Sequence, residues 1–233
     1  MEGDRLSGRE LKNRVAELLK SDDPKIVLAE IVKYRARQVV NPLFSFLYSS
    51  DLNIKWNSII AMGAVVSRLA DEEIESARIV IRRLMWNLND ESGGIGWGSP
   101  EAMGEILASS KVLRNEYASI LLSYAREDGN FQEHAFMQRS VLWGIGRLAE
   151  IQPDLVKDSI AEFIPYLKSS DAIVRGHAAR IIGLIGTESN QVDLAQLLDD
   201  DNEIQTYIDQ KIINCRVLDL AGEAIERLRA RLL

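Results

Sequence analysis

The sequence predicts an all-α solenoid, in which a pair of helices repeats along the chain. A glycine recurs about every 40 residues, the period of helical repeat proteins, at one position of an apolar segment with helical periodicity. A second apolar segment with the same periodicity precedes each of these segments, and short polar turns join the two. The equivalent glycines are Gly63, Gly104, Gly146, Gly183 and Gly222, spaced 41, 42, 37 and 39 residues apart.

The second helix of each repeat carries apolar or small residues nine, five and one positions before its glycine, as Ile54, Ser58 and Met62 do before Gly63. Offsets of four, four and one place these residues on one stripe of a helix. A glycine inside a helix costs about 1 kcal/mol relative to alanine. Five of them in register therefore predict close packing of neighbouring helices, since a catalytic role would not need repeating.

The first helices of the repeats are expected in segments of the chain that are apolar with helical periodicity. The turn that follows reads Ser-Ser-Asp at Ser49 and again at Ser169. Residues 1–34 predict an amino-terminal helical cap, with Pro24 at a helix start behind a capping Asp or Ser. Such a cap would cover the exposed stacking face of the first repeat. The predicted first helices lie within residues 39–50, 74–88, 114–125, 156–170 and 192–200.

The segment LKSSDAIVRGHAARIIGLIG, residues 167–186, resembles a HEAT repeat of the short type found in phycobilisome-lyase-like proteins. The shared pattern is Leu, a short turn, Asp, then Val-Arg-x-x-Ala-Ala and a Gly near the helix end. The resemblance covers residues 35–231 as five units, of which the fourth is the most typical and the second and fifth depart most. It implies an armadillo-like, right-handed α–α superhelix of about five HEAT-like hairpins. We expect residues 35–233 to form one continuous domain with the cap.

Two stretches interrupt the periodicity. Residues 199–209 are acidic and weakly periodic, and we expect them to insert before a last helix that begins near Ile213. In residues 93–98, alternate glycines would unwind the start of the second helix of repeat two. Ser99 as cap and Pro100 at the first helical position would then start that helix about one turn late.

Residues 93–98 would leave a notch in the wall of helices. The notch is interpreted either as an eroded repeat or as a ligand site. Trp97 aligns with Trp56 of an ordinary repeat, which favours an eroded repeat over a ligand site. As a ligand site, a glycine-lined helix start favours anions, but neither a preceding strand nor a Gly-Lys-Ser/Thr ending is present. Residues 84–110 hold four acids and no base, so a cation, an amine or a basic peptide fits better, between Trp86 and Trp97. The four acids are Asp90, Glu91, Glu101 and Glu105.

Other chemistry is sparsely represented. HEAT-repeat hydroxylases with a di-iron centre use repeated His-Glu pairs, whereas this chain has only His134 and His177 and no His-Glu dipeptide. Cys215 is the single cysteine, which precludes an internal disulfide and favours a buried structural thiol over a nucleophile. We find no Ser-His-Asp candidate in a recognisable context. We therefore expect no catalytic residue, no metal site and no cofactor.

Charge and hydropathy narrow the choice of partner. The net charge is −7, and a long acidic body argues against nucleic-acid binding. Arg139, Arg175 and Arg180 could form a basic spot, but one too small for a duplex track. No stretch reaches membrane-spanning length, and no signal peptide is evident, so we expect a cytoplasmic protein without membrane partners.

These observations favour a non-enzymatic scaffold or adaptor that binds a protein partner, with a basic segment preferred, on the concave face near repeats two and three. The first alternative is a lyase-like enzyme or enzyme accessory that binds a cofactor or a protein at the Gly93–Gly98 notch. The second alternative is a DNA-binding HEAT-repeat protein. The expected contacts are Trp86, Asn89, Asp90, Glu91, Gly94, Gly96, Trp97, Glu101, Arg139 and Trp143.

Overall fold

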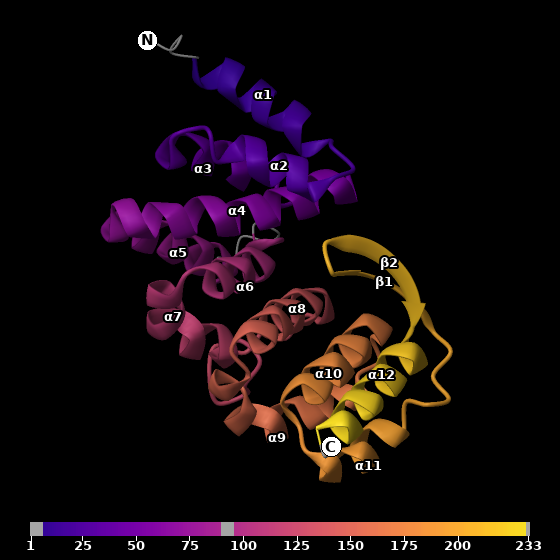
Figure 1. Cartoon of the computed structure of the whole chain (residues 1–233). Coiled ribbons are helices and arrows are strands. Elements are labelled where there is room, and N and C mark those ends of the chain that lie inside the picture. The colour runs from indigo at the N-terminus through magenta and orange to yellow at the C-terminus, as the bar shows by residue number, and fades with distance from the viewer. Residues whose placement is uncertain (1–6, 90–95, 232–233) are drawn as a thin grey trace. The chain divides into compact units, whose positions relative to one another are not determined.

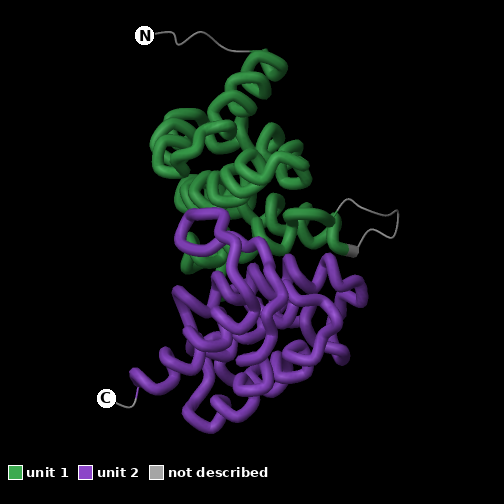
Figure 2. Tube along the Cα trace, turned by 90° about the vertical axis from the view of Figure 1, so that its right-hand side faces the viewer, with its two compact units in different colours: residues 1–115 green, residues 116–233 purple. Residues whose placement is uncertain are grey.

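The computed structural model describes residues 7–89 and 96–231 of the chain. It comprises two compact units, residues 1–115 and 116–233 (Figure 2), and the boundary falls inside helix α7 (Lys111–Ser123). Both units consist mainly of helices, as the sequence predicts for an all-α repeat protein. A single continuous domain stays a prediction.

The first unit is built from helical pairs, in which α2, α4 and α6 are the second helices (Figure 1). Helix α4 packs against α3 and α5 of the first-helix layer and against α2 and α6 of its own layer. Asp23 caps α2 by accepting from the Lys25 amide at 2.9 Å, and Pro24 opens the helix, as predicted. The helices are α1 (Gly8–Leu19), α2 (Pro24–Ile31), α3 (Ala36–Phe44), α4 (Leu52–Glu72), α5 (Ile74–Asn89) and α6 (Ser99–Ser109).

Buried polar residues of α4 complete the ends of the helices beside it. The Asn57 amide donates to the carbonyls of Leu19 and Ser21, at 2.9 and 2.8 Å, beyond the end of α1. The Ser58 hydroxyl donates to the Leu43 carbonyl, at 2.8 Å, near the end of α3. The last carbonyls of a helix have no partner within it. These polar side chains therefore tie two helix ends to the central helix, and their burial is compensated.

The Ser-Ser-Asp turn has the same geometry in both places where it occurs. The Asp51 amide donates to the Ser49 hydroxyl at 3.2 Å, and Asp51 then caps α4 by accepting from the Ile54 amide. The Asp171 amide donates to the Ser169 hydroxyl, also at 3.2 Å, and Asp171 caps α10 (Ala172–Ile185). One sequence motif thus specifies the same start for two second helices.

Two second helices begin late. Helices α4, α8 (Ala135–Ile151) and α10 begin 11 residues before their repeat glycines, whereas α6 and α12 (Val217–Ala230) begin five residues before theirs. The late start of α6 was predicted, but its cap was not. Gly98 is the N-cap, in a left-handed conformation with φ of 78°, and Ser99 is the first helical residue. The expected hydroxyl cap by Ser99 is therefore wrong.

In the second unit α8, α10 and α12 are the second helices, and α10 packs against both of the others. The first helices expected at residues 156–170 and 192–200 are much shorter than predicted. In the first of these segments the α-helix gives way to a 3₁₀ helix at Ile164, and Pro165 lies at this change. Proline has no backbone N–H, so it cannot donate the hydrogen bond that would continue the α-helix. The short segments are η1 (Pro153–Leu155), η2 (Lys157–Ser159), α9 (Ile160–Phe163), η3 (Ile164–Lys168), η4 (Glu188–Asn190) and α11 (Gln191–Ala195).

A β-hairpin precedes the last helix. Strands β1 (Glu203–Ile208) and β2 (Lys211–Arg216) pair in antiparallel register, with Thr206 opposite Ile213. Ile213 and Cys215 therefore lie in a strand, and the prediction that a helix begins near Ile213 is wrong. The predicted insertion is present between α11 and α12, but it is a β-hairpin and not an irregular stretch. Its two-residue turn holds Asp209 and Gln210 at φ of 51° and 61°, without the glycine that usually marks such turns.

The repeat glycines allow close helix packing at some positions only. A Cβ at Gly183 would lie 2.6 Å from the Cβ of Ala224 in α12, and one at Gly63 would lie 3.0 Å from the Glu105 carbonyl oxygen in α6. A Cβ at Gly146 would meet side chains of α10, with Arg180 Nη1 at 3.2 Å and Ile181 Cγ1 at 3.6 Å. A Cβ at Gly222 would have no heavy atom within 4 Å among the described residues. The packing explanation thus fails for Gly222.

Alanine at Gly183 and alanine at Gly222 should change the free energy of unfolding in opposite directions. We predict that Gly183→Ala lowers the free energy of unfolding by about 1–3 kcal/mol, because the new methyl group would overlap Ala224. Gly222→Ala should raise it by up to about 1 kcal/mol, because alanine favours the helix and meets no neighbour. Urea denaturation of both variants measures these changes. Equal effects of the two substitutions would contradict this packing.

The hairpin turn provides a second prediction. Gln210→Gly should stabilise the protein by up to about 1 kcal/mol, because glycine adopts positive φ without steric cost and Asp-Gly suits this turn. Gln210→Val should destabilise it, because a β-branched residue is strained at φ of 61°. Thermal denaturation of the two variants tests the order Gly, Gln, Val. A valine variant as stable as the native chain would show that the turn differs.

Candidate functional site

The four tryptophans of the chain divide into two buried and two exposed residues. Trp56 and Trp143 are 8% and 4% exposed, whereas Trp86 and Trp97 are 74% and 46% exposed. Trp86 and Trp97 lie in the first unit, on α5 and just before α6. The alignment of Trp97 with Trp56 in the repeat therefore does not extend to burial.

Trp86 belongs to an exposed face of α5 that mixes apolar and basic residues. Ile79 lies seven residues earlier, on the same helix face, and is 58% exposed. The guanidinium of Arg83 lies 3.9 Å from the centre of the Phe44 ring and donates to Asn41 at 2.7 Å. Large apolar side chains beside arginine are frequent at protein-binding surfaces. This face is therefore a candidate contact surface.

Gly98 fixes the turn that carries Trp97. With φ of 78°, residue 98 adopts a conformation that suits glycine, and a Cβ there would lie 2.4 Å from the Leu47 carbonyl oxygen. The Ser99 amide donates to the carbonyl of Gly96, at 3.0 Å, which closes the turn. Both observations explain why the repeat is interrupted here by glycine.

Several predicted contacts lie outside the described residues. These are Asp90, Glu91 and Gly94, and with them residues 93–95 of the predicted notch. Asn89 is the last residue of α5, and its side chain is also outside the description. The binding notch at residues 93–98 therefore stays a prediction, which the structure describes only for residues 96–98.

The acids of α6 are buried. Glu101 and Glu105 are 2% and 7% exposed. The carboxylate of Glu101 forms an ion pair with Lys55 of α4, at 3.0 Å, and the Lys55 ammonium lies 5.1 Å from the centre of the Trp56 ring. A buried carboxylate needs such a partner, since unpaired burial is costly. Glu101 is therefore engaged within the unit and does not present its charge to a partner.

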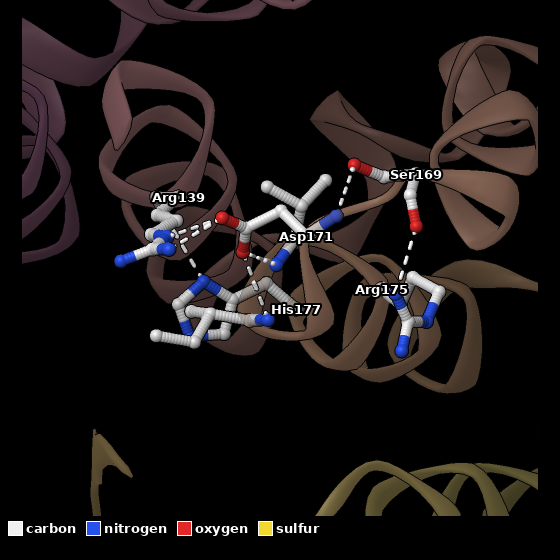
Figure 3. Close-up of polar contacts among 7 residues, drawn as sticks. Arg139, Ser169, Asp171, Arg175 and His177 are labelled. Carbon is white, nitrogen blue, oxygen red and sulfur yellow. Dashed lines mark hydrogen bonds and ion pairs between the residues drawn. The ribbon is translucent and has the colours of Figure 1, made fainter. Parts of the chain in front are cut away.

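In the second unit, Arg139, Asp171 and His177 form a partly buried polar cluster (Figure 3). Arg139 of α8 donates through Nε to Asp171 at 2.8 Å, and Asp171 accepts from the Ile173 amide at 3.0 Å. The His177 Nδ1 lies 3.0 Å from the Arg139 carbonyl oxygen, so Nδ1 is the donor. The cluster joins α8 to the start of α10.

The charge of Asp171 is favoured by its surroundings. Burial alone would raise the pKa of Asp171, but hydrogen bonds from Arg139 and from the Val174 and Ile173 amides outweigh it and lower the pKa. The pKa of Asp200 is also lowered, first by its hydrogen bond from Arg175. Both carboxylates are therefore ionised at neutral pH.

The expected basic spot is neutralised. Arg175 donates to Asp200 at 2.6 Å and to the Ser169 carbonyl at 2.8 Å (Figure 3), and Arg180 pairs with Glu150. Together with the pair formed by Arg139 and Asp171, each of these three arginines faces an acid of the same unit. They consequently hold repeats together and do not form a free cationic patch.

Helices α8 and α10 hold strand β1 by side-chain hydrogen bonds. The indole nitrogen of Trp143 donates to the Tyr207 carbonyl at 2.7 Å, and the two rings are 6.3 Å apart. His177 Nε2 lies 2.9 Å from the Thr206 hydroxyl. Figure 1 shows the hairpin on one side of the row of α8, α10 and α12, with α9 and α11 on the other side. Trp143 is thus occupied by the chain's own strand.

The predicted contacts therefore fall into separate groups. Trp86, Gly96, Trp97 and Glu101 belong to the first unit, and only the two tryptophans among them are exposed side chains. Arg139 and Trp143 lie one turn apart on α8 in the second unit, where both are engaged.

Sequence reasoning missed strand β1 as an occupant of the α8 and α10 surface. The alternation of Ile204, Thr206 and Ile208 was the available signal.

The remaining candidates for chemistry are consistent with structural roles. His134 is exposed at the N-cap of α8, and His177 is 6% exposed with both ring nitrogens bonded. Cys215 is half-buried, so the prediction of a buried thiol is wrong in that respect. Partial burial, Asp219 and Glu223 raise the pKa of its thiol, which disfavours the nucleophilic thiolate. Within the described ranges no group of three His, Cys, Asp or Glu residues has the arrangement of a metal site. None of the described helices is long and apolar enough to cross a membrane.

Comparison with known proteins supports the fold. An engineered protein aligns with a TM-score of 0.52 at 17% identity, over 94% of this chain and 96% of the other. A designed armadillo repeat protein gives 0.50 at 16%, over 94% and 100%. Computationally designed armadillo repeat proteins for modular peptide recognition give 0.51 at 15%, over 94% and 99%. At such identities the likeness concerns the fold alone, an all-α repeat solenoid.

Sequence comparison does not define a family. No protein-family model matches the chain. An uncharacterized protein of Archaeoglobus fulgidus is 25% identical over 189 residues, which cover 79% of this chain and 94% of that protein. The resemblance to phycobilisome-lyase-like HEAT proteins is not confirmed by these matches, whereas the helical repeat architecture is.

The pairing of Asp171 predicts a pH-dependent stability. Asp171→Asn retains a capping residue but removes the charge, and should cost about 1–3 kcal/mol at pH 7. Because the folded pKa lies below 3.8, this contribution is complete above that pH and is lost as the pH falls through the folded pKa. Urea denaturation from pH 7 to pH 3 should show the native and variant chains converging.

Asp154→Asn is the matched control, since the Asp154 side chain is 71% exposed in a surface pair with Lys157. It should change stability much less than Asp171→Asn. A difference between native and Asp171→Asn proteins that is independent of pH would contradict the assigned charge pair.

Proposed function

We propose that this protein is a non-enzymatic, cytoplasmic protein-binding scaffold, with its docking surface in the first unit around Trp86 and Trp97. The observation that carries the proposal is the exposure of these two side chains, 74% and 46%, in a chain that buries its other two tryptophans. Burial of a large apolar side chain stabilises a protein by about 1.5–3 kcal/mol. An exposed tryptophan forgoes much of this gain in the free protein and can recover it in a complex.

The composition of the α5 face supports the same conclusion. Trp86 and Ile79 are exposed on one helix face beside Arg83, whose guanidinium is already held by Phe44 and Asn41. Tryptophan and arginine are the residues most enriched among those that dominate binding energy. A side chain that is ordered before binding loses less entropy when a partner docks.

The proposal reduces the set of contacts expected from the sequence. Trp143 and Arg139 are engaged with Tyr207 and Asp171, so they support the scaffold from within. Glu101 is buried against Lys55. Gly96 is also buried. The proposed contacts are therefore Trp86 and Trp97, with Asn89, Asp90, Glu91 and Gly94 retained from the sequence alone.

The partner is proposed to be a protein segment, with a basic segment preferred. The net charge of −7 favours a cationic partner. Glu101 and Glu105 are buried. Of the four acids expected from the sequence, Asp90 and Glu91 are therefore the two retained for such a segment, on the sequence alone. The designed armadillo repeat neighbours include proteins made for peptide recognition, which supports this use of the fold.

Substitution of both exposed tryptophans tests the proposal. Trp86→Ala combined with Trp97→Ala should reduce recovery of specific partners at least about tenfold, since loss of one hot-spot residue costs about 2 kcal/mol or more. The measurement is quantitative mass spectrometry of proteins that copurify with the native and variant chains from the cells that make them. The variant should keep a cooperative thermal unfolding transition, because the exposed side chains contribute little to the core.

Val192→Ala is the control, because Val192 is 76% exposed in the second unit. It should retain all partners. A double tryptophan variant that folds and still recovers every partner of the native chain would exclude this docking surface.

A further inference from the structure

A pocket of about 490 Å³ lies within the second unit and includes none of the contacts expected from the sequence. It is formed by the segment after α7 and by the segment that includes α9 and η3, with Gln138 of α8 between them. Its size falls within the range of small-ligand sites. The lining residues are Ala125, Arg126, Glu127, Asp128, Phe131, Gln138, Glu162, Pro165, Tyr166 and Ser169.

The apolar part of the pocket includes two aromatic residues, Phe131 and Tyr166. Tyr166 is 9% exposed, and its hydroxyl donates to the Ala125 carbonyl at 2.8 Å. This hydrogen bond holds the ring in place, so one aromatic wall is ordered without a ligand. Aromatic faces attract cations that lie above them.

The charged part of the pocket is acidic. Glu127, Asp128 and Glu162 contribute three negative charges, against one positive charge from Arg126. Arg126 donates twice to Asp128, at 3.0 and 2.8 Å, whereas its Nε is 3.6 Å from the nearer oxygen of Glu162. The guanidinium of Arg126 thus neutralises Asp128 and leaves Glu162 without a charge-assisted hydrogen bond from it.

The carboxylate of Glu162 is incompletely paired, and this concerns its second oxygen most. This oxygen is buried and has no hydrogen-bond partner among the described residues. Buried polar atoms are normally hydrogen-bonded, and an unsatisfied carboxylate oxygen is a strong acceptor for a charged N–H donor. A donor that enters the pocket would meet the accessible part of this carboxylate, since the Glu162 side chain is 30% exposed and lines the pocket together with Phe131 and Tyr166.

The electrostatic field at Tyr166 agrees with an anionic pocket. Burial raises the pKa of Tyr166 to about 12, and the negative charges of Glu127 and Glu162 act in the same direction. The same field that disfavours a phenolate would favour a bound cation.

We infer that this pocket binds a guanidinium group, such as that of an arginine side chain, between Glu162 and the rings of Phe131 and Tyr166. A guanidinium is planar, stacks on aromatic rings and directs several N–H donors in its plane toward a carboxylate. An ammonium group lacks the flat surface that the aromatic walls match. The inference does not depend on the proposed scaffold function, because all the lining residues belong to the second unit.

Titration with a short peptide tests the pocket. The probes are acetyl-Gly-Arg-Gly-amide and its citrulline counterpart, which has nearly the same shape without the charge. The measurement is NMR at low salt, read at the ring signals of Phe131 and Tyr166. We expect the arginine peptide to shift these signals and to bind about tenfold more tightly than the citrulline peptide, as a charge-assisted hydrogen bond and a cation–π contact would give.

Variants identify the group responsible. Glu162→Gln should weaken binding of the arginine peptide at least about fivefold, because it removes the charge that the guanidinium meets. Glu226→Gln makes the same chemical change on α12, outside the lining, and should leave binding unchanged. Titration with n-butylguanidinium distinguishes a small guanidinium compound from an arginine side chain of a protein as the ligand. Equal affinity with the peptide would indicate a small guanidinium compound, and weaker affinity would indicate an arginine within a protein segment.

Equal binding of the arginine and citrulline peptides would overturn the inference. So would the absence of shifts at Phe131 and Tyr166 up to about 20 mM peptide, well above the affinity range of weak sites. Retention of full affinity by a folded Glu162→Gln protein would equally exclude the assigned site. None of these outcomes bears on Trp86 and Trp97, so failure here is distinguishable from failure of the scaffold proposal.

Discussion

The second unit depends on charge pairs that connect each second helix to the repeat that follows it. The carboxylate of Asp171 both caps α10 and accepts from Arg139 of α8, while Arg175 of α10 reaches Asp200 in the next turn. Removal of one partner would leave a buried charge uncompensated, which costs more than the pair itself contributes. These pairs therefore tie neighbouring repeats together, and each of the three arginines is paired with an acid of the same unit.

This use of polar groups within the fold also leaves fewer side chains free for the proposed docking surface. Trp143 and His177 hold strand β1, so the face of α8 and α10 that carries them is covered by the chain's own hairpin. Glu101 is used against Lys55 in the same way. Among the described contacts expected from the sequence, the side chains that remain exposed are those of Trp86 and Trp97.

The regular parts of this fold could be predicted because local sequence specifies them. A Ser-Ser-Asp turn specifies a helix cap, and Gly98 specifies a late helix start. The hairpin could not be predicted with the same ease, since its turn of Asp209 and Gln210 lacks glycine and its strand is held by side chains distant in sequence. The burial of Trp143 likewise depends on tertiary contacts. Gly222 shows that a repeated residue can persist without its packing role.

The division of the tryptophans is the central claim, and fluorine NMR of protein labelled with 5-fluorotryptophan tests it most directly. The measurement is the change in each fluorine shift between H₂O and D₂O, with signals assigned by single Trp→Phe substitutions. Trp86 and Trp97 should show large solvent shifts, and Trp56 and Trp143 small ones. A small shift for Trp86, or a large one for Trp143, would contradict this division of the tryptophans.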